Sequence, residues 1–302
     1  MKTFTEPKAF TEPLKELQGY EELEQALKKT TGVIQVSGCI DAIKPHIAYS
    51  VNNGSGNRII VTFHEQKAKE LLEEYRFFDK KAAYYPAKDI LFYQSDIRGN
   101  VLTAERINAL KMMAEEKECT IITTFDGLMN PMPSPEKFIQ AVKKISVGDT
   151  VELNELTKHL VELGYEKNYQ AETMGEFSVR GGIIDIFSLE YTNPIRMELF
   201  DDEIDSIRTF DVFSQKSIDK IKKVVITPSR EFIYPEDTTS AVEKIKEETN
   251  KYTDDDVLKN IENISDRTYF QGVENYIDYL YDDQNKSIFS YLPDNGIVVM
   301  SD

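Results

Sequence analysis

The hydrophobic positions of the first 125 residues fall into short apolar runs separated by longer amphipathic stretches. Four runs have the length and β-branched content of buried strands: residues 32–38, 58–63, 82–86 and 120–125. Three stretches show the three- and four-residue apolar spacing of helices: residues 42–51, 65–76 and 101–116. Strands that alternate with helical crossovers predict a parallel sheet covered on both faces. We therefore expect an α/β fold class here.

In the middle of the chain, apolar and polar residues alternate with a period of two residues. Two strand arms, residues 177–180 and 183–187, flank Gly181 and Gly182, where only glycine lets the backbone kink or be approached closely. In the next hairpin, Ile195, Met197 and Leu199 alternate with Arg196, Glu198 and Phe200, and a turn at Asp201 and Asp202 follows. This alternation predicts a half-buried antiparallel sheet with one polar face.

Prolines 131, 133 and 135 mark the first boundary, because such a run continues neither a helix nor a central strand. We expect a helix at 151–163 after it, with Asp149 and Thr150 as its cap and Gly164 as its stop. Beyond the hairpins, strand and helix patterns return, and the chain closes on an apolar strand at 296–302. The predicted organisation lists the first part of an α/β domain at 1–130, an inserted α+β domain at 131–218 and the second part of the α/β domain at 219–302.

The charge balance argues against a surface that binds DNA by itself. Lys and Arg number 36 against 53 Asp and Glu, a formal net charge of −17, whereas binding to phosphates requires clustered positive charge. We expect this chain to contact proteins first. No apolar run approaches eighteen residues, so no membrane contact is expected, and without an apolar leader the expected location is cytoplasmic.

The segment where an α/β domain of this kind would have a nucleotide-binding loop departs from the motif of such a loop. A phosphate-binding loop reads G-x-x-x-x-G-K-[ST], but here the predicted first strand runs through Gly38 to Lys44, which lacks the preceding glycine and the following hydroxyl. Pro45 fits the first turn of a helix better than a phosphate-binding turn. We interpret Gly38 and Lys44 as a non-functional relic and expect no ATP binding.

Other catalytic constellations are not recognisable in the sequence. His46, His64 and His159 have no partner at metal-ligand spacing, and Cys39 and Cys119 are interpreted as free thiols. We therefore expect no catalytic residue, no metal and no cofactor in these 302 residues.

Residues 175–213 carry a family resemblance. The order F-x-V-R-G-G-I-I-D-I-F, a short loop and then R-x-E-L-F-D-D-E-I-D-S-I-R-x-F-D resembles the UvrA-binding domain of bacterial nucleotide excision repair. That domain is shared by the helicase subunit UvrB and the transcription-repair coupling factor family, often called Mfd. The paired acids after Phe200 and the degenerate nucleotide loop favour the coupling factors. Residues 85–93, Arg106 and residues 124–129 also look like that family.

This resemblance implies a degenerate RecA-like, P-loop NTPase-like parallel-sheet domain interrupted by an α+β UvrA-binding domain. It implies a non-catalytic N-terminal module that recruits UvrA to RNA polymerase stalled at DNA lesions. The parent protein would be an ATP-dependent DNA translocase, whose contacts with DNA and RNA polymerase belong to domains absent from this chain.

The resemblance also implies the residues that bind UvrA. Arg180 and Glu198 are retained, whereas Lys167 and Ser178 stand where the family has arginines. We expect Arg180 and Glu198 on neighbouring strands, on the solvent face and near Lys167.

Two alternatives stay open. The chain could be a stand-alone P-loop hydrolase or a nuclease, which an ATP-dependent thermal shift with magnesium would reveal. It could also be a fragment of UvrB or of another repair helicase, which would require a conventional G-K-[ST] loop.

Overall fold

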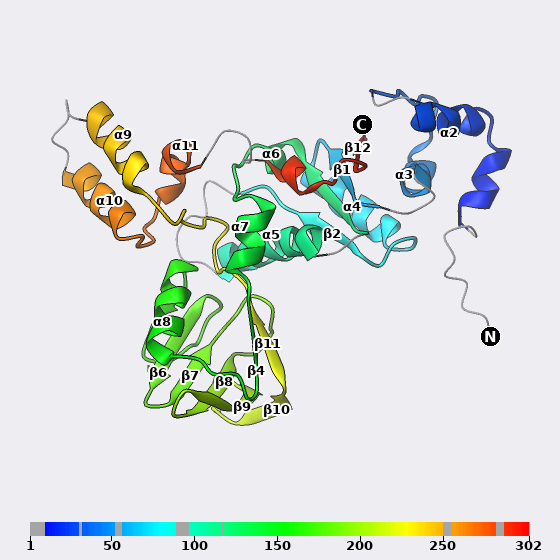
Figure 1. The fold of residues 1–302 in the computed structure, drawn as a ribbon. Coiled ribbons are helices and arrows are strands. Elements are labelled where there is room, and N and C mark those ends of the chain that lie inside the picture. Colours follow the sequence, from blue (N-terminus) through cyan, green and yellow to red (C-terminus); the bar gives the residue numbers. More distant parts are fainter. Residues whose placement is uncertain are drawn as a thin grey trace. The chain divides into compact units, whose positions relative to one another are not determined.

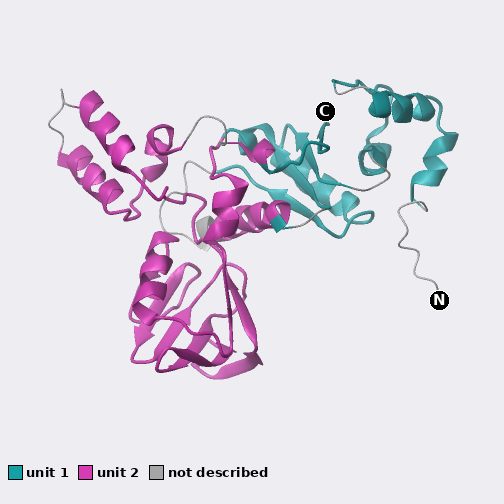
Figure 2. Cartoon of the chain, viewed as in Figure 1, with its two compact units in different colours: residues 1–88, 115–129, 291–302 teal, residues 89–114, 130–290 magenta. Residues whose placement is uncertain are grey.

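The structure, a computed structural model, describes residues 10–29, 32–51, 56–88, 97–115, 118–249, 255–281 and 287–301. The chain divides into two compact units, shown in Figure 2. Unit 1 comprises Met1–Lys88, Glu115–Met129 and Tyr291–Asp302, and unit 2 comprises Asp89–Ala114 and Asn130–Ser290. The chain passes from unit 1 to unit 2 after Lys88 and again after Met129, and the second of these passages is next to the proline run.

Unit 1 contains a four-stranded parallel sheet (Figure 1). Its strands are β1 (Arg58–Thr62), β2 (Ala82–Tyr85), β3 (Thr120–Thr124) and β12 (Ile297–Met300), in the order β12-β1-β3-β2. β1 and β3 are buried at every position, as strands covered on both faces must be. The expected α/β class is confirmed.

Helices surround this sheet, and α4 supplies much of its core. The helical segments are η1 (Glu12–Glu16), α2 (Tyr20–Lys29), η2 (Asp41–Ile43), α3 (Lys44–Ser50), α4 (Glu65–Tyr75) and α6 (Phe125–Leu128). Leu71 and Leu72 of α4 share a buried cluster with Ile60 of β1 and Ile122 of β3, because the apolar residues of α4 recur at helical spacing.

A buried arginine ties β1 to these helices. Nη1 of Arg58 donates to the Tyr75 hydroxyl at 2.8 Å, and Nη2 donates to the Val51 carbonyl at 3.2 Å. The guanidinium also lies 5.8 Å from the centroid of the Tyr49 ring. Burial raises the pKa of the Tyr75 hydroxyl, which therefore stays neutral beside the charge.

The expected buried strand at residues 32–38 is wrong. These residues form no regular element, and Val33 is 98% exposed. Residues 32–38 pair with no described strand, and β12 and β3 are the strands on either side of β1, so this apolar run has no sheet neighbour against which it would be buried. The helix that follows begins at Lys44 with Pro45 in its first turn, as expected, after a 3₁₀ turn at Asp41–Ile43.

Unit 2 contains a six-stranded sheet in the order β10-β9-β8-β7-β6-β5. The strands are β5 (Glu166–Lys167), β6 (Glu176–Arg180), β7 (Ile183–Ile186), β8 (Ile195–Phe200), β9 (Glu203–Phe210) and β10 (Ser217–Ile221). β4 (Lys143–Ser146) and β11 (Lys223–Ile226) pair with each other, and α8 (Leu153–Glu162) packs on the same core. Both hairpins predicted from the two-residue alternation are confirmed.

The start of α8 differs from the expectation that Asp149 and Thr150 cap it. The helix begins at Leu153, and Glu152 at its N-cap makes no side-chain capping bond. Asp149 accepts instead from the Ser146 amide at 2.7 Å, and Thr150 forms a bridge to Glu203. Asp149 therefore stabilises a turn and Thr150 contacts a strand, and neither caps the helix. Gly164 does end the helix, with φ at +83°.

Further helices complete unit 2. They are α5 (Ile97–Glu115), α7 (Pro135–Ala141), α9 (Thr239–Thr249), α10 (Asp255–Ser265), η5 (Val273–Tyr276) and α11 (Ile277–Leu280), and η7 (Ile288–Tyr291) follows at the unit boundary. α9, α10 and α11 share a buried cluster with Phe232 and Tyr234. Within the ranges given above, no helix combines the length and apolar character needed to cross a membrane.

Unit 2 also contains a buried ion pair. The Arg106 guanidinium in α5 and the Glu231 carboxylate after β11 pair through two hydrogen bonds, Nε to Oε1 and, at 2.9 Å, Nη2 to Oε2. Their side chains are 2% and 4% exposed. Arg106 belongs to the second stretch of family resemblance, of which residues 89–93 lie outside the described residues.

Removing one charge of this pair should destabilise the fold strongly. We expect Glu231→Gln to lower the free energy of unfolding by about 3–5 kcal/mol, because the Arg106 charge stays buried without its counter-charge. Urea denaturation followed by circular dichroism measures this. The matched control is Glu65→Gln, which removes the exposed partner of Lys69 and should cost less than about 1 kcal/mol. Equal effects of the two changes would contradict the prediction.

Candidate partner-binding surface

The six-stranded sheet of unit 2 has one apolar and one polar face. Phe177, Ile184, Ile195, Met197 and Ile207 fill the apolar face and are at most 1% exposed. On the other face the register aligns polar residues across the strands. One row runs through Ser178, Asp185, Arg196 and Arg208, and the next through Arg180, Ile183, Glu198 and Ser206.

Asp185 lies at the centre of the polar face and is 2% exposed. Its carboxylate accepts two bonds from Arg196, Nε at 2.6 Å and Nη2 at 2.7 Å. Nη2 of Arg180 donates to the same carboxylate at 2.7 Å. Two guanidinium groups therefore share one buried acid, and Arg180, with 41% of its side chain exposed, faces solvent.

Arg196 is the most firmly held of these arginines. Its guanidinium lies 4.2 Å from the centroid of the Phe210 ring and donates to Oε1 of Gln215 at 2.9 Å. The sequence analysis did not select Asp185, Arg196 or Arg208 as site residues. The signal was present, because Asp185 is the only acid in the apolar run after Gly182, and Arg196 alternates with the core residues of β8.

Glu198 forms a second charged pair beside the first. Its carboxylate accepts from Nη2 of Arg208 at 2.6 Å and from the Ser206 hydroxyl at 2.9 Å. The hydrogen bond from Arg208, followed by that from Ser206, lowers the pKa of the Glu198 carboxyl to about 2. Glu198 therefore presents a fixed negative charge at neutral pH.

Arg180 and Glu198 share the polar face, but the expectation that they lie on neighbouring strands is wrong. Arg180 is on β6 and Glu198 on β8, with β7 between them. Ile183 of β7 is opposite both residues. The reason is that consecutive hairpins place the strands side by side in chain order, so alternation identifies the face of a residue and not its neighbours.

The other two predicted site residues occupy different surroundings. Lys167 is exposed on the edge strand β5 and aligned with Phe177, so the register does not bring it onto the face that carries Arg180. Ser178 is on that face beside Asp185 but is 1% exposed. Within the described part of the chain, its hydroxyl has no hydrogen-bond partner.

The glycine pair holds two hairpins together at one end of the sheet. Gly181 has φ at +60°, and the Leu199 amide donates to the Gly182 carbonyl at 2.8 Å. A side chain at Gly182 would place its Cβ 2.9 Å from the Leu199 carbonyl oxygen. The prediction that these positions need glycine is confirmed.

The segment that we interpret as a degenerate nucleotide loop, with Gly38 and Lys44, is in unit 1. Gly38 has φ at +80° in an exposed segment, and the Lys44 ammonium is 2.9 Å from the Asp41 carboxylate. The hydrogen bond and charge of Lys44 lower the pKa of the Asp41 carboxyl. Lys44 thus already lies beside a negative charge, an arrangement that opposes phosphate binding.

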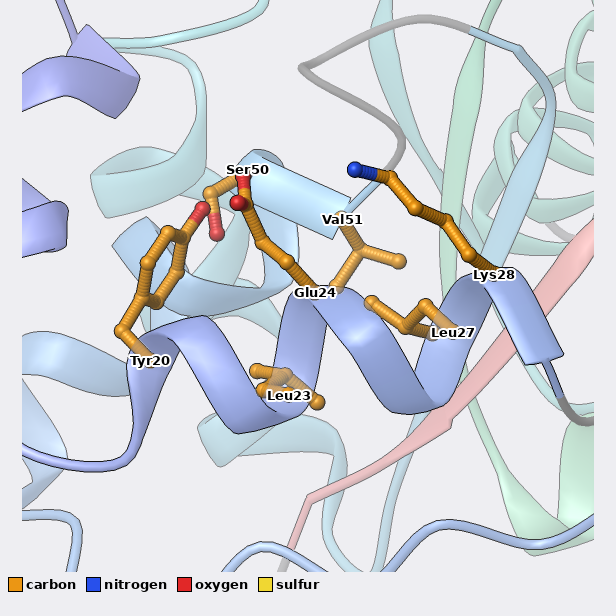
Figure 3. A pocket seen from close by; sticks show the side chains of 7 residues that line it. All are labelled: Tyr20, Leu23, Glu24, Leu27, Lys28, Ser50 and Val51. Carbon is orange, nitrogen blue, oxygen red and sulfur yellow. The ribbon is translucent and has the colours of Figure 1, made fainter.

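Unit 1 also has a small hollow of about 190 Å³ between α2 and the end of α3, shown in Figure 3. Its lining mixes aliphatic, aromatic and charged side chains: Tyr20, Leu23, Glu24, Leu27, Lys28, Ser50 and Val51. The hollow is open, and its one acid and one base are at a helical spacing along α2. A ligand site usually needs several converging polar groups, so the sheet face in unit 2 is the better candidate.

Comparison with known proteins connects this surface to a family. The model of the UvrB interaction domain matches residues 144–232, which include every polar-face residue described above. The transcription-repair-coupling factor of Bacillus subtilis (strain 168) is 29% identical over 237 residues, which are 74% of this chain and 20% of that protein. That of Staphylococcus aureus (strain bovine RF122 / ET3-1) is 32% identical over 240 residues, which are 75% of this chain and 20% of that protein. The chain spans about a fifth of the length of these curated relatives, and the resemblance expected from residues 175–213 is confirmed.

The relic loop should not bind nucleotide. Isothermal titration with ATP and magnesium should show no saturable heat, because Lys44 is paired with Asp41 and residues 38–44 lack the glycine that precedes the lysine of a phosphate-binding loop. Lys44→Ala should leave folding unchanged, as should the control Lys67→Ala, which removes the other lysine beside Asp41. Micromolar ATP binding that disappears only in Lys44→Ala would show a working site.

The Glu198 carboxyl should titrate well below its ordinary pKa of about 4.3. NMR titration of glutamate side-chain carbons should give a pKa near 2, and Arg208→Met should raise it by removing its first cause. Because the folded pKa is lowered, the pair stabilises the protein above about pH 4.3, and this contribution is lost as pH falls toward 2. The control Arg230→Met, which removes the partner of Glu166, should leave the Glu198 pKa unchanged. A Glu198 pKa that is insensitive to Arg208→Met would refute the assignment.

Proposed function

We propose that this chain, a relative of the transcription-repair-coupling factors that carries a UvrB interaction domain, recruits UvrA through the polar face of its six-stranded sheet. The observation that carries the proposal is the ordered charge array around Asp185 inside the matched residues 144–232. In the proposed role the chain has no catalytic step of its own. Its contribution is a binding surface.

The geometry supports a protein contact because the charged groups are pre-organised. Asp185 holds Arg196 through two bonds and Arg180 through one, and Glu198 is held by Arg208 and Ser206. Side chains that are already ordered lose little conformational entropy when a partner binds. A planar guanidinium with free donors also suits a carboxylate on the partner.

The face carries both signs of charge within a strongly acidic chain. Arg180 presents a positive group and Glu198 a negative one, with Ile183 between them. A complementary partner therefore places an acid opposite Arg180 and a base opposite Glu198. Such complementarity selects a partner and sets the register of binding more than it raises affinity.

The two departures from the family pattern weaken this contact. Lys167 provides a point charge where an arginine would form a planar fork, and it lies in an edge strand aligned with the apolar face. Ser178 is buried and short, so it offers a partner no charge. We infer that Arg180 and Glu198 carry most of the binding energy contributed by the four predicted residues.

The wider role belongs to the longer protein. We propose that the whole protein couples UvrA recruitment to RNA polymerase stalled at DNA lesions, and that it translocates on DNA with ATP through domains outside this chain. The support is the similarity to transcription-repair-coupling factors over three quarters of the chain.

Removing Arg180 or the Glu198 charge should weaken UvrA binding. We expect Arg180→Ala to cost roughly 1–3 kcal/mol of binding free energy and Glu198→Gln the same or less, measured by calorimetry with purified UvrA. The fold should survive Arg180→Ala, because Arg196 still pairs with Asp185 through two bonds.

A matched control removes an exposed ion pair in the other unit. Glu65→Ala combined with Lys69→Ala should leave UvrA binding unchanged. A folded Arg180→Ala, Glu198→Gln double variant that binds UvrA at full affinity would place the interface elsewhere.

A further inference from the structure

Phe200 is a large apolar side chain that the core does not use. It is the last residue of β8, and its ring is 81% exposed. Its neighbour Leu199 faces the opposite way and packs against the buried cluster of the sheet. A single exposed phenylalanine is ordinary on a protein surface, so what distinguishes Phe200 is its place beside the charged residues of the polar face.

The ring belongs to the same face as the charged rows. Leu199 is opposite Ile204, which is fully buried, and Phe200 is opposite the exposed Glu203. Alternation along β8 therefore places Phe200 on the side of Glu198. Ile183, which is only partly buried, is opposite Glu198 in the adjacent strand. Phe200 is thus a second apolar residue on this face, one row beyond the row that contains Arg180, Ile183 and Glu198.

The backbone around Phe200 is fixed on both sides. Before it, the Leu199 amide donates to the Gly182 carbonyl at 2.8 Å. After it, Asp201 takes a left-handed φ of 56°, and the Asp202 carbonyl accepts from the Val151 amide at 2.7 Å. Thr150 bridges Glu203 on the same turn. The backbone that carries the ring is therefore already ordered before a partner binds, which favours an energetic hot spot.

We propose that Phe200 is the apolar anchor of the proposed UvrA-binding surface. The ring would enter an apolar pocket on UvrA whose rim carries an acid facing Arg180 and a base facing Glu198. An aromatic ring surrounded by charged groups that exclude water is the usual composition of an interface centre. This inference rests on the proposed function and adds the residue that contributes the apolar part of the contact.

The chain supplies its own matched control. Phe213 is a second phenylalanine in the same sheet domain, 94% exposed, in the turn between β9 and β10 and away from the Phe200 turn. Calorimetry with purified UvrA should show at least tenfold weaker binding for Phe200→Ala and less than a twofold change for Phe213→Ala. Phe200→Tyr should keep most of the affinity. Neither alanine change should lower the melting temperature, because both rings are exposed.

The outcomes separate this inference from the proposed function. Undiminished binding by Phe200→Ala, together with weaker binding by Arg180→Ala, would refute the anchor and leave the surface standing. Equal losses for Phe200→Ala and Phe213→Ala would also refute it, because the apolar contribution would not be local. No binding of UvrA by the unaltered chain would overturn the proposed function and the anchor together.

Discussion

The buried carboxylate of Asp185 is the charge on which the candidate surface depends. A carboxylate that is 2% exposed loses most of its hydration and must recover that free energy from hydrogen bonds. Arg196 supplies two of them and Arg180 a third. The carboxylate thereby orients Arg180 toward solvent, and the stacking of Arg196 on Phe210 keeps the centre of the array in place. The need to compensate a buried charge thus orders the charged side chains of the candidate surface.

Local sequence patterns predicted the helices and strands of this chain far better than they predicted which strands lie next to each other. The two-residue alternation around Met197 and the glycine pair identified the hairpins because both signals act over a few residues. Assigning Arg180 and Glu198 to neighbouring strands failed because periodicity reports a face and carries no information on strand order. The prediction of a buried strand at 32–38 failed for a related reason, since an apolar run is buried as a strand only if it pairs, and the run itself does not show that both edges of β1 pair with segments far along the chain.

The candidate site was predictable in part. The alternation of charged and apolar residues along the strands predicted the polar face of the sheet, and both Arg180 and Glu198 lie on that face. The buried partner of Arg180 was missed, because Asp185 is a single acid in an apolar run whose role appears only when three strands are aligned. The alternation already placed Phe200 on the side of Arg196 and Glu198, but the extent of its exposure is known only from the structure.

The pairing of β12 with β1 has a consequence for the order of folding. A ribosome that has made β1, β2 and β3 must still synthesise the whole of residues 130–290 before β12 exists, which takes on the order of ten seconds or more at typical elongation rates. During that interval one edge of β1 has no partner from β12, and an open strand edge is a site of wrong pairing. In the sheet of unit 2, β6, β7, β8 and β9 pair with strands that are their neighbours in the sequence. These pairs can form without a later segment of the chain. We therefore expect the nascent chain to complete the candidate surface of unit 2 before it completes the four-stranded sheet of unit 1.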